Sequence, residues 1–450
     1  MSDKKKYERP IIQKQYSGFM NKFSSNPISQ IKSEIDGVPV KELIKKFGSP
    51  LFVISEKKIR HNIKNAYRIF KNRYPKVQFA WSYKTNYLNA VCSVYHSEGS
   101  WAEVVSGFEY DKARKLGIPG ENIIFNGPDK TVEELTRAVK EKAKIHIDHF
   151  DELFKLIEIT ESLNLTASVA IRVNMDVGIY PKWDRFGFNY ENGEALQAIK
   201  RIMSQKKLEL IGLHTHIGTY IMKADAYKIA TEKLVALAKN IKDEFQKNIQ
   251  YIDIGGGFAS KNNLIGQYLP AENIIPSLEE YAEAITSSLF EFSNNRDEIP
   301  MLILEAGRAL IDDTTCLLST VIANKRLSNG KRSIIIDAGV NILFTSFWYK
   351  HPVYLTENNG TSSEDASIYG PLCMNIDVIR ESISMPPLKT GDNILIDMVG
   401  AYNMTQWMQF ISMRPNVVMI MDDGEIELIR KAETIDTLNS QEILPKKFQK

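Results

Sequence analysis

Short apolar runs alternate with longer amphipathic runs from about residue 51 to residue 304, and this alternation constrains the fold more than any other feature. Helical spacing links the short runs; Ile59, Ile63, Ala66 and Ile69, for example, fall on one helical face. The runs with strand character cover residues 51–54, 77–83, 123–125, 144–147, 167–173, 208–213, 249–254 and 301–304. About eight such units over roughly 255 residues predict a closed (β/α)8 barrel of the TIM type. A doubly wound open sheet is the alternative for the same alternation.

The chain has 450 residues, which is more than one small core accommodates. The pattern of apolar and polar residues also changes along its length. Residues 1–35 are polar and irregular and predict an N-terminal extension. Residues 36–310 make up the predicted barrel, and residues 311–450 predict a second, mainly β domain in which turns separate short strands. The Gly37-Val38-Pro39 segment leaves open whether the strand at 51–54 belongs to the barrel or to the second domain.

The composition is that of an ordinary globular protein and excludes several functional classes. Apolar residues make up 43% and charged residues 25%, and the net charge of +2 gives no case for nucleic-acid binding. No run approaches 18 apolar residues and no apolar leader opens the chain, so neither a membrane span nor a secretory signal is expected. Three cysteines do not form a disulfide framework, and the predicted compartment is the cytoplasm.

Lys84 ends the alternating apolar strand at 77–83. A lysine at the end of such a strand is costly unless it is paired, exposed or used chemically. Desolvation lowers the pKa of an amine, and a neutral amine can form a Schiff base. The alternative interpretation is a lysine that simply reaches solvent.

Other unusual residues follow further predicted strands, at the barrel end where chemistry gathers. Gly255-Gly256-Gly257 lets backbone amides approach an anion, although three glycines also suit a tight turn. His214 and His216 lie on one strand face, but no third ligand stands at a suitable local spacing, so no metal site is predicted. Glu305 and Arg308 precede an apolar run, which argues against a simple surface ion pair.

One chemical hypothesis uses all of these groups. A Schiff-base lysine, a glycine loop for a phosphate, a histidine stacked on a flat ring and a carboxylate facing a pyridine nitrogen describe a pyridoxal phosphate (PLP) site. Glu305 would keep the ring nitrogen protonated, and a protonated ring withdraws electrons better than a neutral one.

With these motifs the sequence resembles the fold type III PLP-dependent decarboxylases, which include diaminopimelate, ornithine and arginine decarboxylases. The resemblance covers about residues 48–421. The matching motifs, in the family order, are Tyr83-Lys84-Thr85-Asn86, Glu103-Val104-Val105-Ser106-Gly107, Arg185-Phe186-Gly187, His214-Thr215-His216-Ile217-Gly218-Thr219, Gly255-Gly256-Gly257-Phe258, Glu305-Ala306-Gly307-Arg308, Gly370-Pro371-Leu372-Cys373 with Asp377, and Gly400-Ala401-Tyr402. The implied fold is an alanine-racemase-like barrel with a C-terminal β domain.

The resemblance implies a PLP site at eight matching positions, which are Lys84, His216, Thr219, Gly256, Gly257, Glu305, Arg308 and Tyr402. Lys84 would hold the cofactor as a Schiff base, His216 would stack on the ring and Glu305 would pair with the ring nitrogen. The other positions would bind the phosphate, with Thr219 where the family usually has serine.

The resemblance also implies a catalytic acid and a dimer. Cys373, helped by Asp377, would protonate the substrate carbon after CO₂ leaves. In the family this cysteine comes from the neighbouring subunit, so an obligate homodimer with two shared sites is expected. Outside such a motif, the ordinary interpretation of Cys373 is a small buried apolar residue.

The positions that read the substrate depart from the known members. Arg308, Thr345, Tyr349 and Met374 are the candidate substrate-binding residues. Met374 stands where the family has an acid for the distal ammonium, and Thr345 where an arginine for the distal carboxylate is expected, while Tyr349 is retained. We therefore expect a modified or conjugated amino acid of a specialised pathway, such as siderophore assembly, rather than free diaminopimelate.

Four alternatives remain open at this stage: a diaminopimelate decarboxylase of lysine biosynthesis, a PLP-dependent amino-acid racemase, a non-catalytic regulator with the same fold, and a metal-dependent barrel hydrolase. Cys373 and Asp377 favour decarboxylation over racemisation, which needs a second base on the other ring face. The intact Lys84 and Glu305 argue against a non-catalytic relative. The histidine and carboxylate spacing does not support the hydrolase.

Overall fold

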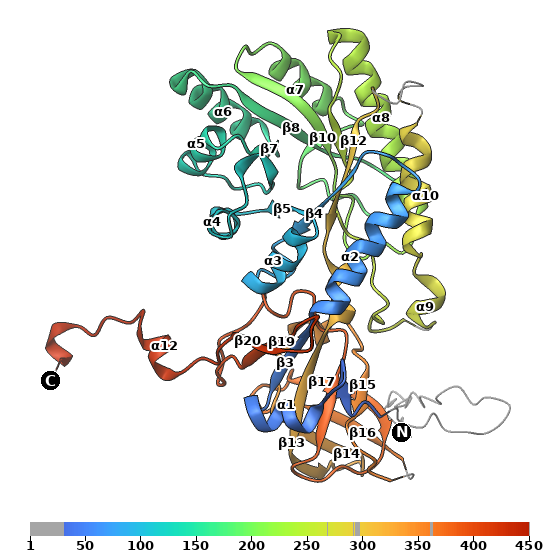
Figure 1. The fold of residues 1–450 in the computed structure, drawn as a ribbon, viewed down its shortest axis with the longest axis vertical. Helices are drawn as coiled ribbons and strands as arrows, with labels where there is room; N and C mark the ends of the chain where they lie inside the picture. The colour runs from blue at the N-terminus through green and yellow to red at the C-terminus, as the bar shows by residue number, and fades with distance from the viewer. Residues whose placement is uncertain (1–30, 268, 291, 293–297, 361–362, 450) are drawn as a thin grey trace, which may run out of the picture.

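The computed structural model describes residues 31–267, 269–290, 292, 298–360 and 363–449, and most of the predicted N-terminal extension, residues 1–30, lies outside this part (Figure 1). Eight parallel strands pair in a ring, since β10 pairs with β8 on one side and β11 on the other, and β12 pairs with β4. These strands are β4 (Val77–Ser82), β5 (Trp101–Val104), β6 (Ile123–Phe125), β7 (Lys144–Ile147), β8 (Ala167–Asn174), β10 (Leu208–His214), β11 (Tyr251–Asp253) and β12 (Met301–Ala306). The predicted closed barrel is therefore confirmed over the open sheet.

One barrel strand differs from the sequence prediction. β5 lies between β4 and β6, although its Glu103 interrupts the apolar pattern by which strands are recognised. The predicted first strand, β3 (Leu51–Ser55), instead pairs with strands of the second domain. All five of its residues are buried. A continuous apolar run indicates a central strand but not the sheet that contains it.

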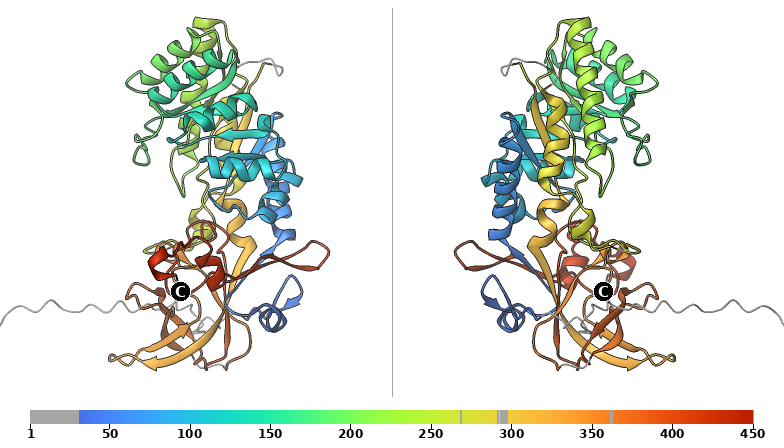
Figure 2. Two further views of the ribbon diagram at one scale, coloured as in Figure 1. Left: turned by 90° about the vertical axis from the view of Figure 1, so that its left-hand side faces the viewer. Right: turned by 90° about the vertical axis from the view of Figure 1, so that its right-hand side faces the viewer.

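Helices cover the outside of the barrel (Figures 1 and 2). They are α2 (Glu56–Lys71), α3 (Asn89–Ser97), α4 (Gly107–Lys115), α5 (Val132–Lys140), α6 (Phe150–Leu163), α7 (Glu194–Met203), α8 (Asp225–Phe245) and α10 (Leu278–Leu289), with the shorter α9 (Ala271–Ile274) and α11 (Arg308–Ile311). A capping box begins α5, because the Thr131 side chain accepts from the backbone of Glu134 and the Glu134 side chain accepts from the backbone of Thr131. The short β9 (Phe188–Asn189) pairs with the end of β8.

The second domain is built on a mixed sheet below the barrel (Figure 2). Its strands are β3, β13 (Thr315–Arg326), β14 (Arg332–Ile336), β15 (Val353–Leu355), β16 (Glu364–Tyr369), β17 (Val378–Met385), β18 (Asn393–Ile396), β19 (Asn416–Ile420) and β20 (Ile426–Arg430). The N-terminal hairpin β1 (Glu34–Ile35) and β2 (Val38–Pro39) leads into α1 (Val40–Phe47), whose Val40 and Leu43 pack in a cluster with residues of β3, β13 and β19. Residues 34–55 thus join the second domain although they come first in the chain.

The two domains meet beside Lys84. The Tyr402 backbone N–H donates to the Thr85 carbonyl at 2.8 Å, and the Thr405 hydroxyl donates to the Lys84 carbonyl at 2.9 Å. The Asn86 side-chain amide donates to the Gly400 carbonyl at 3.2 Å. Three bonds between the loop after β18 and the turn after β4 place Tyr402 at the mouth of the barrel.

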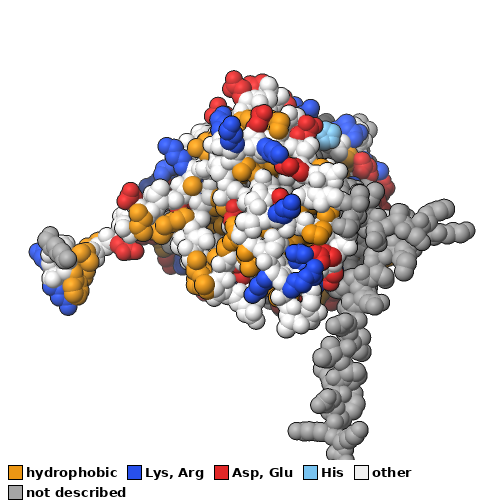
Figure 3. Space-filling view, turned by 90° about the horizontal axis from the view of Figure 1, so that it is seen from below, with side chains coloured by type: hydrophobic (Ala, Val, Ile, Leu, Met, Phe, Trp, Pro, Cys, Tyr) orange, Lys and Arg blue, Asp and Glu red, His pale blue; other side chains and the backbone are white. Residues whose placement is uncertain are grey.

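The C-terminal segment with α12 (Ile435–Asn439) extends away from the body of the molecule (Figures 1 and 3). Its apolar side chains Ile435, Ile443, Leu444 and Phe448 are exposed. Within the described residues, no helix combines the length and the apolar character that a membrane crossing requires.

Candidate active site

A cavity opens at the carboxyl ends of the barrel strands, where the second domain covers the barrel. The volume of the cavity is about 390 Å³, including the part at its mouth that is open to solvent. It is lined by Ser82, Lys84, Thr85, His216, Thr219, Tyr220, Gly256, Gly257, Phe258, Glu305, Gly307, Arg308, Ala309 and Tyr402. All eight positions predicted to hold the cofactor are among these residues, so segments far apart in the sequence form one site.

Lys84 is held in the cavity by an ion pair. Its Nζ lies 2.5 Å from Glu103 Oε2, and its side chain is 34% exposed whereas Glu103 is fully buried. Burial alone would lower the pKa of Lys84, but Glu103 and Glu305 raise it above its usual value. In the protein without its cofactor, the two carboxylates thus outweigh the effect of burial on the pKa of this amine.

Glu305 is the next-to-last residue of β12 and is buried at the floor of the cavity. Its Oε1 accepts a hydrogen bond from the Asn126 side-chain amide, which also donates to Glu103 at 2.9 Å. Burial and the neighbouring Asp253 carboxylate raise the pKa of Glu305 well above its usual value. A buried carboxylate of this kind is stabilised by a positively charged group such as a protonated pyridine.

The glycine loop after β11 packs too closely for side chains. Gly255 and Gly257 have positive φ angles of +69° and +91°, and a Cβ on Gly257 would collide with the backbone oxygen of Gly218. The Gly256 N–H donates to His216 Nδ1 at 3.1 Å and so orients the imidazole. The glycines are needed both for the backbone conformation and for the approach of the loop to its neighbours.

Arg308 supplies the positive charge opposite this loop. Its guanidinium lies 4.5 Å from the ring centre of Tyr349 and 4.8 Å from that of Tyr402. Its Nη1 is buried and makes no hydrogen bond among the described residues, and the nearest carboxylate, Asp312, is 3.8 Å away. An unpaired buried guanidinium N–H requires an acceptor, and the phosphate of PLP satisfies this requirement.

His216 lies beside Trp183, with ring centres 5.4 Å apart. Burial lowers the pKa of His216 well below its usual value, so the ring is neutral. A neutral, oriented ring suits stacking on a flat cofactor. Together with the buried Glu305 and the Arg308 Nη1, which lacks a hydrogen-bond partner among the described residues, this geometry fits PLP.

Cys373 does not line the cavity of its own chain. It is exposed, on the loop between β16 and β17. Asp377 shapes this loop, since its carboxylate accepts from the backbone N–H of Val340 at 2.8 Å and of Leu372 at 2.7 Å. Burial raises the pKa of Asp377. The geometry thus gives Asp377 a contact with the loop backbone, and its help to Cys373 stays a prediction.

Three of the positions expected to bind the substrate, Thr345, Tyr349 and Met374, lie outside the cavity lining. Thr345 is fully buried, and its hydroxyl lies 2.9 Å from Asn403 Oδ1 and 2.8 Å from His351 Nε2. Met374 is half-buried against the core, and Tyr349 is buried against Arg308. None of the three belongs to the cavity lining, so their contact with substrate stays a prediction.

Two functional side chains had no role assigned from the sequence. Glu103 pairs with Lys84, and Asn126 joins Glu103 to Glu305. Asn126 directly follows β6, as other site residues follow their strands, whereas Glu103 lies within β5. A polar residue directly after an apolar barrel strand is the signal that identifies Asn126, and this signal does not mark Glu103.

Comparisons with known proteins agree with this geometry. Residues 60–312 match the pyridoxal binding domain of the pyridoxal-dependent decarboxylases. The diaminopimelate decarboxylase of Methanocaldococcus jannaschii is 30% identical over 443 residues, which cover 94% of this chain and 98% of that protein. The corresponding protein of Aquifex aeolicus is 31% identical over 412 residues, or 89% and 93% of the two chains.

Solved structures extend the similarity to three dimensions. The crystal structure of the M. jannaschii enzyme aligns with a TM-score of 0.85 at 29% identity and covers 94% of this chain and 99% of that one. The same enzyme in complex with L-lysine aligns with a TM-score of 0.84. The chain therefore belongs to the pyridoxal-dependent decarboxylases, and it is a PLP-dependent enzyme that decarboxylates an amino acid.

Proposed function

We propose that this protein is a diaminopimelate decarboxylase, which releases one α-carboxylate as CO₂ and leaves lysine. The observation that carries the proposal is similarity over nearly the whole chain to relatives of that name, one of them solved with L-lysine bound. The similarity includes both domains, and the cavity lies where they meet.

The expectation of a modified or conjugated substrate in a specialised pathway is wrong. The relatives at 26–31% identity are named diaminopimelate decarboxylases. The expectation rested on the uncharged Met374 and Thr345, but neither lines the cavity. The residue types at two positions outside the cavity of their own chain do not determine which distal group of a substrate the protein binds.

PLP supplies an electron sink for the pair of electrons left when CO₂ departs. Lys84 would hold the cofactor through its aldehyde, while Arg308 and the glycine loop would bind its phosphate. His216 would cover one ring face and Glu305 would neutralise the charge of the ring nitrogen. The Glu305 carboxylate at the floor would thus orient the cofactor and set its charge.

Cys373 is the proposed proton donor to the substrate carbon, and we infer that it acts in the neighbouring subunit of a homodimer. Its exposure on a loop outside its own cavity supports this arrangement. The distal group of the substrate would then be contacted by residues of both subunits.

The test is turnover by the purified, PLP-loaded protein. The stereoisomers of diaminopimelate, with lysine and ornithine as comparison substrates, are each incubated with the protein while CO₂ and amino-acid products are measured. Lysine in a 1:1 ratio to CO₂ is expected from diaminopimelate. Lys84→Ala is the control, since it removes the visible cofactor band and the product together.

Two outcomes would contradict the proposal. A PLP-loaded protein that releases CO₂ from another amino acid but not from diaminopimelate is a decarboxylase of different specificity. Loss of optical activity without CO₂ would indicate racemisation.

A further inference from the structure

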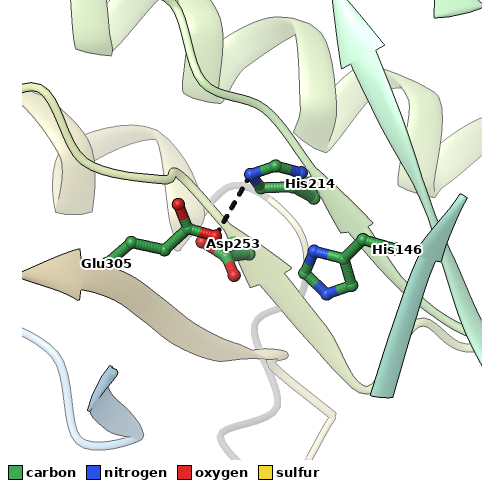
Figure 4. Close-up of side chains that lie close together, drawn as sticks. All are labelled: His146, His214, Asp253 and Glu305. Carbon is green, nitrogen blue, oxygen red and sulfur yellow. Dashed lines mark ion pairs between the residues drawn. The ribbon is translucent and has the colours of Figure 1, made fainter. Parts of the chain in front are cut away.

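Four buried titratable side chains point toward one another below the cavity (Figure 4). They are His146 on β7, His214 on β10, Asp253 on β11 and Glu305 on β12. Their ligand atoms lie within 4.8 Å of one another, and His214 Nε2 is 3.3 Å from Glu305 Oε1. The proposed function uses only Glu305 of this cluster, so the other three residues require an explanation.

The cations nearest the cluster already have partners. Lys84 lies 2.5 Å from Glu103, Lys130 lies 2.7 Å from Glu152, and Arg172 lies 3.5 Å from Asp148. Among the described residues, no lysine or arginine forms an ion pair with Asp253 or Glu305. Two buried carboxylates a few ångströms apart with no cation cannot both be ionised without a large cost, so a proton is needed.

The histidines do not carry this proton. Burial lowers the pKa of His146 and of His214 well below the usual value, and the neighbouring cations lower both further. Burial raises the pKa of Asp253 to about 7, with Glu103 adding to the effect and Lys84 opposing it. Glu305 shifts in the same direction because of burial and of Asp253. Both carboxylates therefore bind protons more tightly than exposed carboxylates do.

Charged and titratable groups from several strands and loops surround the pair. They are Lys84 after β4, Glu103 on β5, His146 and Lys144 on β7, Asp148 after β7, Arg172 on β8, His214 and His216 at the end of β10, Tyr251 on β11, and Lys130 in the loop after β6. Lys84 lowers the pKa of both Asp253 and Glu305, but burial and the neighbouring carboxylates outweigh it.

A metal ion explains the cluster less well than a proton. A tetrahedral zinc ion with bonds of about 2.1 Å holds its ligand atoms about 3.4 Å apart. Groups that share a proton through one buried water, at hydrogen bonds of about 2.8 Å, are about 4.6 Å apart. The spread of up to 4.8 Å suits the second arrangement. His146 Nδ1, both His214 nitrogens and Asp253 Oδ2 are buried without a hydrogen-bond partner, so polar atoms are available for such a water.

We propose that Asp253 and Glu305 form a carboxylate pair that holds one shared proton when PLP is absent, and that Asp253 thereby positions the proton on the ring nitrogen when PLP is bound. Asp253 does not line the cavity and acts through Glu305, so it is a positioning residue. Its Oδ1 also accepts the Gly255 N–H at 2.8 Å, which couples the pair to the phosphate loop.

When PLP binds, the O–H bond of the pair breaks. The proton moves to an unprotonated ring nitrogen, or to solvent if the nitrogen brings its own proton. Either way, two carboxylates then face one positively charged ring, which supplies the cation that the pair lacks.

The first test uses the wild-type full-length chain. Infrared spectra are recorded at pH 7 before and after PLP is added to the cofactor-free protein. We expect the C=O stretch of one buried carboxylic acid to disappear on PLP binding. Burial also raises the pKa of Glu109 to about 7, and Lys84 lowers it, so the same difference spectrum is recorded with Glu109→Gln to identify any contribution from Glu109. A difference spectrum without loss of this band would overturn the proposal.

The second test follows the ring nitrogen itself in holoenzyme loaded with ¹⁵N-labelled PLP. In Asp253→Asn, which can still accept the Gly255 N–H, the pH at which the nitrogen loses its proton should fall by at least one unit, or tenfold in proton affinity. Glu109→Gln is the matched control, since it removes another buried carboxyl that does not face Glu305, and its midpoint should equal that of the wild type.

Two results of these tests would refute the shared proton. One is an Asp253→Asn midpoint equal to that of the wild type. The other is stoichiometric zinc that copurifies with the wild type and is lost in His146→Gln, because the cluster would then be a metal site. If Asp253→Asn does not fold, the infrared experiment on the wild type decides alone. Both tests depend on PLP binding and not on which amino acid is decarboxylated, so they are independent of the proposed substrate.

Discussion

At the scale of single residues, the ion pair between Lys84 and Glu103 governs how the protein captures its cofactor. The amine must lose its proton before it attacks an aldehyde, and Glu103 and Glu305 hold its pKa above the usual value. Glu103 in turn is stabilised in the ionised form: burial would raise its pKa, but Lys84 and the hydrogen bonds around it keep the pKa below its usual value.

Cofactor capture should therefore accelerate with pH. Because the neutral fraction of Lys84 grows about tenfold per pH unit below its pKa, the visible band should form about tenfold faster at pH 9 than at pH 8. Glu103→Gln removes the largest charge that raises the pKa of Lys84, so capture should be faster than in the wild type at pH 7. Stopped-flow absorbance measures both. Asp111→Asn, an exposed carboxylate paired with Arg137, should match the wild type.

Arg308 should contribute most of the phosphate affinity. Loss of charge-assisted hydrogen bonds worth about 1.5–3 kcal/mol predicts that Arg308→Met weakens PLP binding by roughly 10–150-fold. Arg308→Lys keeps the charge but loses the contacts with the rings of Tyr349 and Tyr402, so its affinity should be intermediate. Arg326→Met, a surface residue paired with Glu364, is the control. If Arg308→Met and the wild type bind PLP with equal affinity in equilibrium titrations, Arg308 does not bind the phosphate.

At the scale of elements, the loop after β11 functions only if it is free of side chains. Its amides approach the cavity because Gly257 has φ +91° and lies against the Gly218 backbone. A loop built on glycine at these positions is rigid through packing rather than through its own conformational preference.

Two alanine substitutions separate these contributions. Gly257→Ala adds both backbone strain and a collision with the Gly218 oxygen, so the melting temperature and the PLP affinity should both fall. Gly266→Ala has the same kind of strain, with φ +85°, but no atom within 4 Å of the added Cβ. It should cost only about 1 kcal/mol and leave PLP affinity unchanged. If the two variants bind PLP equally, the close packing of the loop is irrelevant to the cofactor.

At the scale of the whole molecule, the cavity depends on both domains and, we infer, on a second subunit. Tyr402 of the second domain completes the lining, whereas Cys373 lies outside it. An acid on an exposed loop cannot protonate a substrate in its own cavity without a rearrangement of that loop.

Mixing two inactive variants tests the shared site. Lys84→Ala lacks the cofactor lysine and Cys373→Ala lacks the acid, and each alone should lose most activity. After equal amounts exchange subunits, half of the dimers contain one intact site of two, so about one quarter of wild-type activity should return. Absence of recovery, with exchange verified by sedimentation of tagged subunits, would place both residues in the same chain.

Much of this arrangement was predictable from local patterns. The alternation of apolar and amphipathic runs predicts the barrel, and unusual residues after strands indicate Lys84, the glycine loop, His216, Glu305 and Arg308, whereas Thr219 and Tyr402 were implied only by the family resemblance. These features depend on periodicity and on residue type, which are local properties. Strand β5 was not predicted because Glu103 breaks its apolar pattern. The sheet that contains β3 could not be predicted because a buried apolar run does not specify its neighbours.

The sequence by itself determined which chemical groups the protein has and the order in which strands and helices occur, since both follow from residues close together in the chain. Only the tertiary structure decided that Asn126 joins Glu103 to Glu305, that Asp253 faces Glu305 without a cation, and that Thr345 and Met374 lie outside the cavity. These relations depend on distances between strands far apart in the sequence. A pKa or a specificity depends on such distances, because electrostatic energy falls with separation in space and not along the chain.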